Sequence, residues 1–197
     1  MTDPFAAARD IFDKGIDRPL VEMVMRSNLL QLPFYSPQQE AADNLLGKAL
    51  RAMHDGDEDR VERYVRRAVA LPYDENEEAD TALFAARMAI YAAVTDLLDE
   101  ADEDDSRWLD AAERVLDTCP DGPREYLHRT LADVIEEYRL PKPELRRLRA
   151  ALDRHPAPGP EPDDVPADGL RSEAERAQLV RDALQAIVLL ERALDSL

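Results

Sequence analysis

Glu125 and His128 have the Glu-x-x-His spacing with which carboxylate-rich helical bundles hold a metal. Such a site needs both side chains on the inner face of their helix and a second pair of the same kind on another helix. At about 100° per residue, Glu125 lies about 140° and His128 about 80° from the apolar face around Leu127. The chain also contains no second Glu-x-x-His pair. We therefore expect Glu125 to point into solvent, and we predict no metal site and no cofactor.

Arg87 stands in the middle of the weakly charged stretch TALFAARMAIYAAVT. On a helix over residues 75–100 it falls about 40° from Leu83, inside a stripe of bulky apolar side chains. A guanidinium buried there requires a carboxylate or carbonyl oxygens, because an unpaired buried charge is costly. Asp80 lies on the same side of the helix, and Tyr91 belongs to the same stripe. Two interpretations stay open: an internal ion pair, or a polar pocket in which Asp80, Arg87 and Tyr91 bind a small molecule or an anion.

The other side of the same helix carries only small side chains, which allow a neighbouring helix to approach closely: Ala85, Ala86, Ala89, Ala92 and Ala93. The pattern therefore predicts that helix 75–100 is buried on two sides, as the central helix of the protein. Its apolar run is too short and too charged to span a bilayer, for which about 20 apolar residues are needed. We expect no association with a membrane.

The last segment, 171–197, is predicted to be an amphipathic helix with an interaction surface. Six apolar residues follow the alternating three- and four-residue spacing of a coiled-coil seam: Val180, Ala183, Ile187, Leu190, Leu194 and Leu197. The seam is short for an isolated coiled coil, so it must be buried against something else. Either the helix folds back onto its own body, or it packs against a protein partner, including a second copy in a homodimer.

Two predicted helices carry basic faces in an otherwise acidic chain. The first has Arg60, Arg63 and Arg67, and the second has Arg146, Arg147, Arg149 and Arg154. The acidic block DLLDEADEDD at 96–105 is their natural counterpart, in the same molecule or in a partner. A net charge of −18 repels phosphates, so we predict no nucleic acid as a partner.

The composition indicates a cytoplasmic protein with an acidic surface of the kind found at high salt. The 43 acidic residues far outnumber the 25 basic ones, and only 3 of the latter are lysine. Cys119 is the only cysteine, so no internal disulfide forms, and no apolar signal begins the chain. We find no glycine-rich phosphate loop, nucleophile elbow or zinc spacing, and we predict no catalytic residues.

The elements that must position these residues are helices. Only six glycines and much Ala, Leu, Arg and Glu indicate an all-α fold. Caps and prolines divide the chain into helices near 3–15, 17–31, 37–54, 57–71, 75–100, 105–118, 122–140, 143–154 and 171–197. The prediction is a single bundle of about eight antiparallel helices over residues 1–154. A proline-rich linker or surface strap over 155–170 then leads to the last helix.

Residues 45–72 resemble one tetratricopeptide-type helical hairpin, with a Gly-Asp turn and Pro72 as its terminator. No second copy follows, and such repeats are stable only in groups of at least about three, so we do not assign the family. From the sequence we expect a non-enzymatic protein that acts through protein–protein association, as an adaptor, regulator or self-assembling unit. A small-molecule or anion binder with a pocket around Arg87, including an enzyme, is the alternative.

Overall fold

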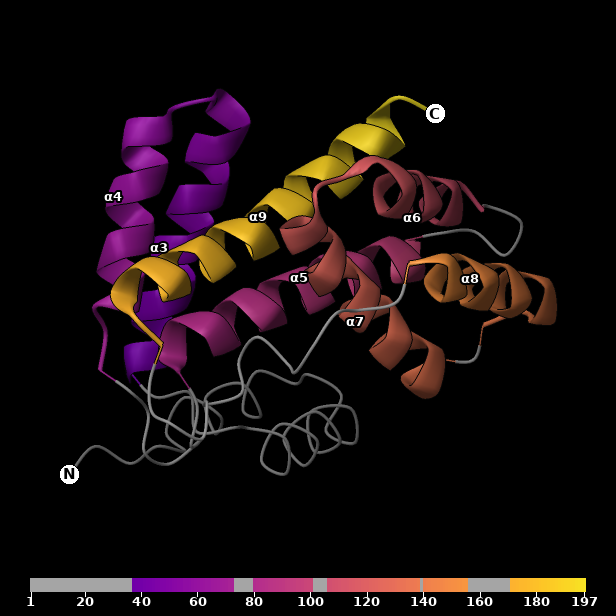
Figure 1. Cartoon of the computed structure of the whole chain (residues 1–197), viewed down its shortest axis with the longest axis horizontal. Coiled ribbons are helices and arrows are strands. Elements are labelled where there is room, and N and C mark those ends of the chain that lie inside the picture. Colours follow the sequence, from indigo (N-terminus) through magenta and orange to yellow (C-terminus); the bar gives the residue numbers. More distant parts are fainter. Residues whose placement is uncertain (1–36, 73–79, 101–105, 139, 156–170) are drawn as a thin grey trace, which may run out of the picture. The chain divides into compact units, whose positions relative to one another are not determined.

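Seven helices account for nearly all of the residues that the structure describes. The computed structural model describes residues 37–72, 80–100, 106–138, 140–155 and 171–197, which belong to one compact unit, Ser36–Leu197. Its helices, shown in Figure 1, are α3 Pro37–Asp55, α4 Glu58–Val69, α5 Thr81–Glu100, α6 Arg107–Thr118, α7 Asp121–Glu137, α8 Lys142–Arg154 and α9 Glu173–Asp195. They pack as a single bundle, and no strand occurs among these residues, so the all-α prediction is confirmed. The helices predicted at 3–15 and 17–31 and most of the proline-rich strap lie outside the described residues.

Local signals determine where these helices begin and end. Gly56 has a positive φ of 72° at the turn between α3 and α4, and the side chain of Asp57 accepts a hydrogen bond from the Arg60 N–H at 3.1 Å. At the start of α9, Ser172 Oγ accepts from the Glu175 N–H at 3.2 Å, while the Glu175 carboxylate accepts from the Ser172 N–H at 2.8 Å. This reciprocal capping box satisfies two donors that the first helical turn leaves free.

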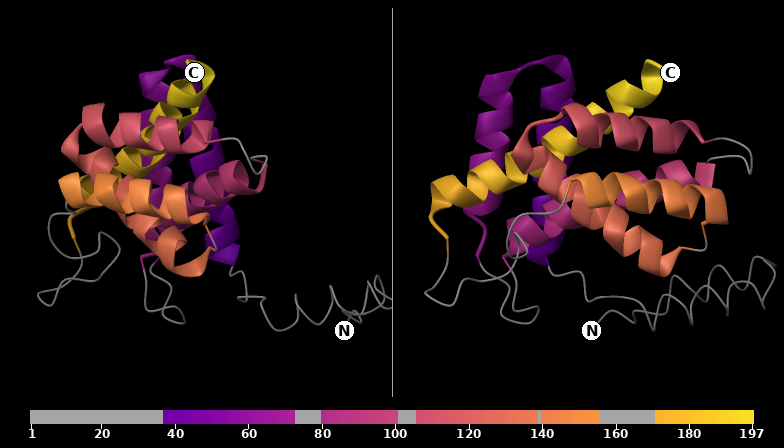
Figure 2. Two further views of the ribbon diagram at one scale, coloured as in Figure 1. Left: turned by 90° about the vertical axis from the view of Figure 1, so that its right-hand side faces the viewer. Right: turned by 45° about the vertical axis from the view of Figure 1, so that its right-hand side comes forward.

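The last helix, α9, is the central element of the bundle. It packs against α3, α4, α5, α6 and α7, and it runs diagonally between the α3–α4 hairpin and the α6–α7 pair (Figure 1, Figure 2). Eight of its residues are buried, on more than one side of the helix: Val180, Ala183, Leu184, Ala186, Ile187, Val188, Leu190 and Ala193. A helix that is apolar on several sides must be covered on several sides. The predicted C-terminal helix thus packs within the bundle rather than at its edge.

The predicted seam of α9 is mostly core. Val180, Ala183, Ile187 and Leu190 are at most 2% exposed, Leu194 is half-buried and Leu197 is 55% exposed. The part of the seam from Val180 to Leu190 is thus buried inside this chain. This agrees with the interpretation in which the helix folds back onto its own body. The seam does not form a free surface of the described protein.

Helix α5 packs against α3, α4, α7 and α9 and keeps one solvent-facing side, whereas α9 contacts five helices. Leu83, Ala86 and Ile90 are fully or almost fully buried, whereas Met88 is 41% exposed and Ala92 is also exposed. Among the described helices, only the stretch Thr81–Leu98 is long and apolar enough to cross a membrane, so the sequence-based estimate of its length was too short. In this structure the stretch packs against α3, α7 and α9, as core helices of soluble proteins do.

We predict that the folded state depends on α9 side chains more than on any surface contact. Leu184→Ala should lower the free energy of unfolding by about 3 kcal/mol, because it leaves a cavity where a fully buried side chain was. Leu197→Ala is the matched control and should change it by less than about 0.5 kcal/mol. Urea unfolding followed by circular dichroism measures both. Equal effects of the two substitutions would contradict the central position of α9.

Candidate functional site

Asp80 joins two helices at a buried corner. Its Oδ1 accepts hydrogen bonds from the backbone N–H groups of Ala82 and Leu83, both at 3.1 Å, and so caps the start of α5. Its Oδ2 forms an ion pair with Arg176 of α9, although the Arg176 Nε–H is not aligned for a hydrogen bond. The two side chains are 6% and 15% exposed, so the pair is shielded from water. The geometry gives Asp80 a structural role.

Arg87 and Tyr91 both turn toward α7. The Arg87 guanidinium lies 3.5 Å from the Asp133 carboxylate, and its side chain is 37% exposed, so this ion pair between α5 and α7 is only partly buried. The Tyr91 hydroxyl donates to Glu137, and this hydrogen bond, with partial burial, raises the pKa of Tyr91 to about 12. Asp80, Arg87 and Tyr91 thus each engage a different protein side chain. Their joint ligand-binding role stays a prediction, and these contacts lend it no support.

Glu125 and His128 are both partly buried in the bundle. Glu125 is only 21% exposed and pairs with Arg129 at 2.9 Å, so the expectation that it points into solvent is wrong. His128 Nε2 lies 3.3 Å from the Leu152 carbonyl oxygen of α8, and burial lowers the pKa of its imidazole. In the part of the chain that the structure describes, no three His, Cys, Asp or Glu side chains converge to hold a metal.

Asp182 of α9 sits directly over Gly122 at the start of α7. A Cβ atom at Gly122 would collide with the Asp182 carboxylate, so only glycine allows this close approach. Burial raises the pKa of Asp182, and the nearby Glu125 carboxylate raises it further, while a hydrogen bond from Gln178 Nε2 at 2.9 Å opposes the shift. An ionised Asp182 carboxylate at the crossing of α7 and α9 therefore lowers the stability of the folded state.

Helix α8 divides its cations between two faces. Arg147 binds Asp110 and Glu113 of α6, which raises the pKa of its guanidinium, and Arg154 lies 3.7 Å from Asp117 of the same helix. Its remaining cations, Lys142, Arg146 and Arg149, are exposed and have no partner among the described residues. Their spacing of four and three residues places them within about 60° of one another.

We call Lys142, Arg146 and Arg149 the basic face of α8. The sequence-based prediction identified this helix as net positive but did not name Lys142. It also did not distinguish the cations that pair with acids of α6 from those that face solvent. The i, i+4, i+7 spacing is the signal that finds the face. Helix α8 lies at the edge of the bundle, with α6 and α7 as its main neighbours, so its outer side is accessible.

The basic stripe expected on α4 is partly neutralised by contrast. Arg60 pairs with Asp57 at 3.1 Å, whereas Arg63 and Arg67 are exposed and have no partner within the described ranges. Two unpaired cations remain there against three on α8. Arg63 and Arg67 therefore serve as a matched comparison for the basic face.

We predict that the buried Asp80–Arg176 pair matters more to stability than the surface Arg87–Asp133 pair. Asp80→Asn keeps an acceptor for the α5 cap but leaves Arg176 without its counter-charge, and should cost about 3 kcal/mol. Asp133→Asn should cost less than about 1 kcal/mol, because exposed pairs contribute little. Chemical denaturation of both variants provides the comparison. A larger loss of unfolding free energy in Asp133→Asn than in Asp80→Asn would contradict this ranking of the two ion pairs.

Asp182→Asn should stabilise the protein at neutral pH. An acid whose pKa is raised by folding binds its proton more tightly in the folded state, so the stability linked to it falls as pH rises through that pKa. The amide removes this loss while keeping an acceptor for Gln178. Melting temperatures of variant and wild type should converge at pH values below the ordinary pKa of Asp and separate above it. A variant that is less stable at pH 7 would show that the ionised carboxylate is favourable.

No protein-family model, curated protein or solved structure matches the chain.

Proposed function

We propose that this protein is non-enzymatic and acts by associating with a partner protein, and that the basic face of α8 docks an acidic segment of that partner. The observation that carries the proposal is that three exposed cations on one helical face have no carboxylate partner among the described residues, in a chain of 43 acidic and 25 basic residues. Where acids are in such excess, a cation readily finds an internal carboxylate, as Arg147 does. Cations that stay without an internal carboxylate are suited to bind a carboxylate of another protein.

The basic face rests on a firm support. On the opposite side of α8, Leu148, Ala151 and Leu152 are buried, and Arg147 ties the helix to α6 through two carboxylates. The three cations therefore project from a helix whose backbone is already held in place. A preorganised surface of this kind loses less entropy on binding than a mobile one. Its charges favour the choice and orientation of an acidic partner more than raw affinity.

An acidic protein segment fits this face better than a nucleic acid does. The net charge of −18 opposes the approach of a phosphate backbone over the rest of the surface. Helix α8, KPELRRLRAALDR, also offers no aromatic ring on which a base could stack. A short acidic segment needs to contact only the local face.

The other predicted surface, the seam of α9, supports association less well. Four of its six residues are in the core, so α9 would have to leave the bundle before they could meet a partner. The cost of exposing those side chains would reduce any affinity gained. The basic face is available without rearrangement.

Quantitative affinity capture at native salt, from cells that produce the protein, tests the proposal. The triple variant Lys142→Glu, Arg146→Glu, Arg149→Glu is compared with wild type and with a control that reverses two cations of α4, Arg63→Glu and Arg67→Glu. We expect a protein with an acidic segment to be retained by wild type and control and lost by the triple variant. Circular dichroism must first show that all three are equally folded. If no captured protein distinguishes the triple variant from the control, the proposal is wrong.

A titration with a synthetic ten-residue Asp/Glu peptide tests the contact directly. Amide chemical shifts should change along α8, and charge reversal should weaken binding about tenfold or more. A matched Asn/Gln peptide should not bind. Shifts spread over the whole surface, or stronger binding of a DNA duplex than of the peptide, would contradict an acidic protein partner.

A further inference from the structure

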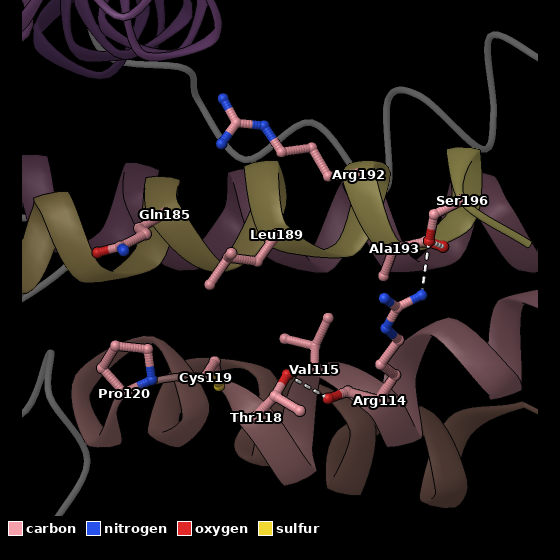
Figure 3. A pocket seen from close by; sticks show the side chains of 10 residues that line it. All are labelled: Arg114, Val115, Thr118, Cys119, Pro120, Gln185, Leu189, Arg192, Ala193 and Ser196. Carbon is pink, nitrogen blue, oxygen red and sulfur yellow. Dashed lines mark hydrogen bonds between the residues drawn. The ribbon is translucent and has the colours of Figure 1, made fainter.

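A cavity of about 300 Å³ lies between α6 and the second half of α9 (Figure 3). Val115 of α6, Cys119 directly after α6 and Ala193 of α9 are buried, with Leu189 half-buried beside them, and they form an apolar floor. In Figure 3, Val115 points toward α9 and Leu189 toward α6, so the two apolar side chains close the space from opposite sides. The volume is at the lower end of the range that small-molecule sites occupy.

The rim of this cavity carries a cation, Arg114, that forms no ion pair within the described ranges of the chain. Arg114 donates from Nη1 to the Ser196 hydroxyl at 2.7 Å, and Ser196 in turn donates to the Ala193 carbonyl at 2.8 Å. The hydroxyl is a neutral acceptor, and a guanidinium has five N–H donors, so most of the donors of Arg114 remain unused. No acidic partner of Arg114 occurs among the described residues.

Two further rim residues have different orientations. Gln185, half-buried, lines the cavity, and its side-chain amide has no hydrogen-bond partner in the described structure. Arg192 also belongs to the lining, but in Figure 3 its guanidinium points away from α6. Arg114 is therefore the cation that faces across the cavity, with an amide available on the opposite helix.

We infer that this cavity binds a small amphiphilic carboxylate, with its carboxylate on Arg114 and its short apolar chain on the floor made by Val115, Leu189 and Ala193. A guanidinium fork matches a carboxylate in geometry and charge, and the charge-assisted hydrogen bonds it forms are stronger than neutral ones. The small volume excludes bulky ligands. The site is independent of the basic face of α8.

The occupant would also stabilise the fold. Helix α9 is the element against which five other helices pack, and one wall of the cavity belongs to it. A ligand that binds only the folded state stabilises it by an amount that grows with the logarithm of 1 + [L]/Kd, so the melting temperature rises with ligand concentration. Binding at this site is therefore measurable without knowledge of the natural ligand.

Octanoate is the probe, titrated into the full chain and followed by methyl resonances of Val115 and Leu189 and by melting temperature. We expect saturable shifts with an affinity on the order of millimolar or tighter, and an increase in melting temperature. Octanol has the same apolar chain without the charge. We expect its affinity to be lower than that of octanoate by about tenfold or more. Arg114→Gln should weaken octanoate by about the same factor, since it removes a charged hydrogen bond.

Arg192→Gln is the matched control, because it removes a cation from the same rim that points away from the cavity. It should leave octanoate binding unchanged. Arg114 and Arg192 are both exposed, so neither variant should unfold the protein. The inference is overturned if octanoate produces no saturable shift, if octanol binds as tightly, or if Arg114→Gln binds like wild type. Equal weakening by both arginine variants would also overturn it, because that result indicates attraction to surface charge alone.

Discussion

The burial of α9 is the constraint on which the other helices depend. Its apolar residues face several directions, and each neighbouring helix covers one part of that surface while burying its own apolar side against it. The neighbours also contact one another, as α3 does with α4, but only α9 touches α3, α4, α5, α6 and α7. A change in the position of α9 would therefore disturb most of the bundle at once.

Polar contacts set the orientation that apolar burial leaves open. Arg176 reaches Asp80 at the start of α5, Arg181 reaches Glu58 and Glu62 of α4, and the His54 ring of α3 lies 2.7 Å from Glu191. Apolar packing is not directional, whereas these contacts are satisfied in few arrangements. They hold α9 in register with three of its neighbours. Only the Asp80 pair is well shielded, so the others contribute more to orientation than to stability.

The two proposed sites share α6. One side of this helix supplies Asp110, Glu113 and Asp117, which neutralise Arg147 and Arg154 and leave the basic face of α8 outside. The same helix also supplies Arg114 and Val115 to the cavity against α9. Asp110 and Asp117 stand four residues before and three residues after Arg114, but they pair with Arg147, Arg154 and His155. Within the described residues, the acids next to Arg114 along the helix are thus engaged by other cations.

Sequence alone determined the helices of this protein, because caps, glycine turns and prolines act within a few residues: α3, α4, α6, α7 and α8 begin and end close to the predicted bounds. It also showed that the apolar seam of helix 171–197 must be buried against something. Only the tertiary structure decided which helix is central, that Asp80 pairs with Arg176 rather than Arg87, and which cations of α8 face solvent. A sequence pattern states that a face must be buried or a charge matched. It does not name the partner, because many distant residues satisfy the same requirement and packing selects one of them.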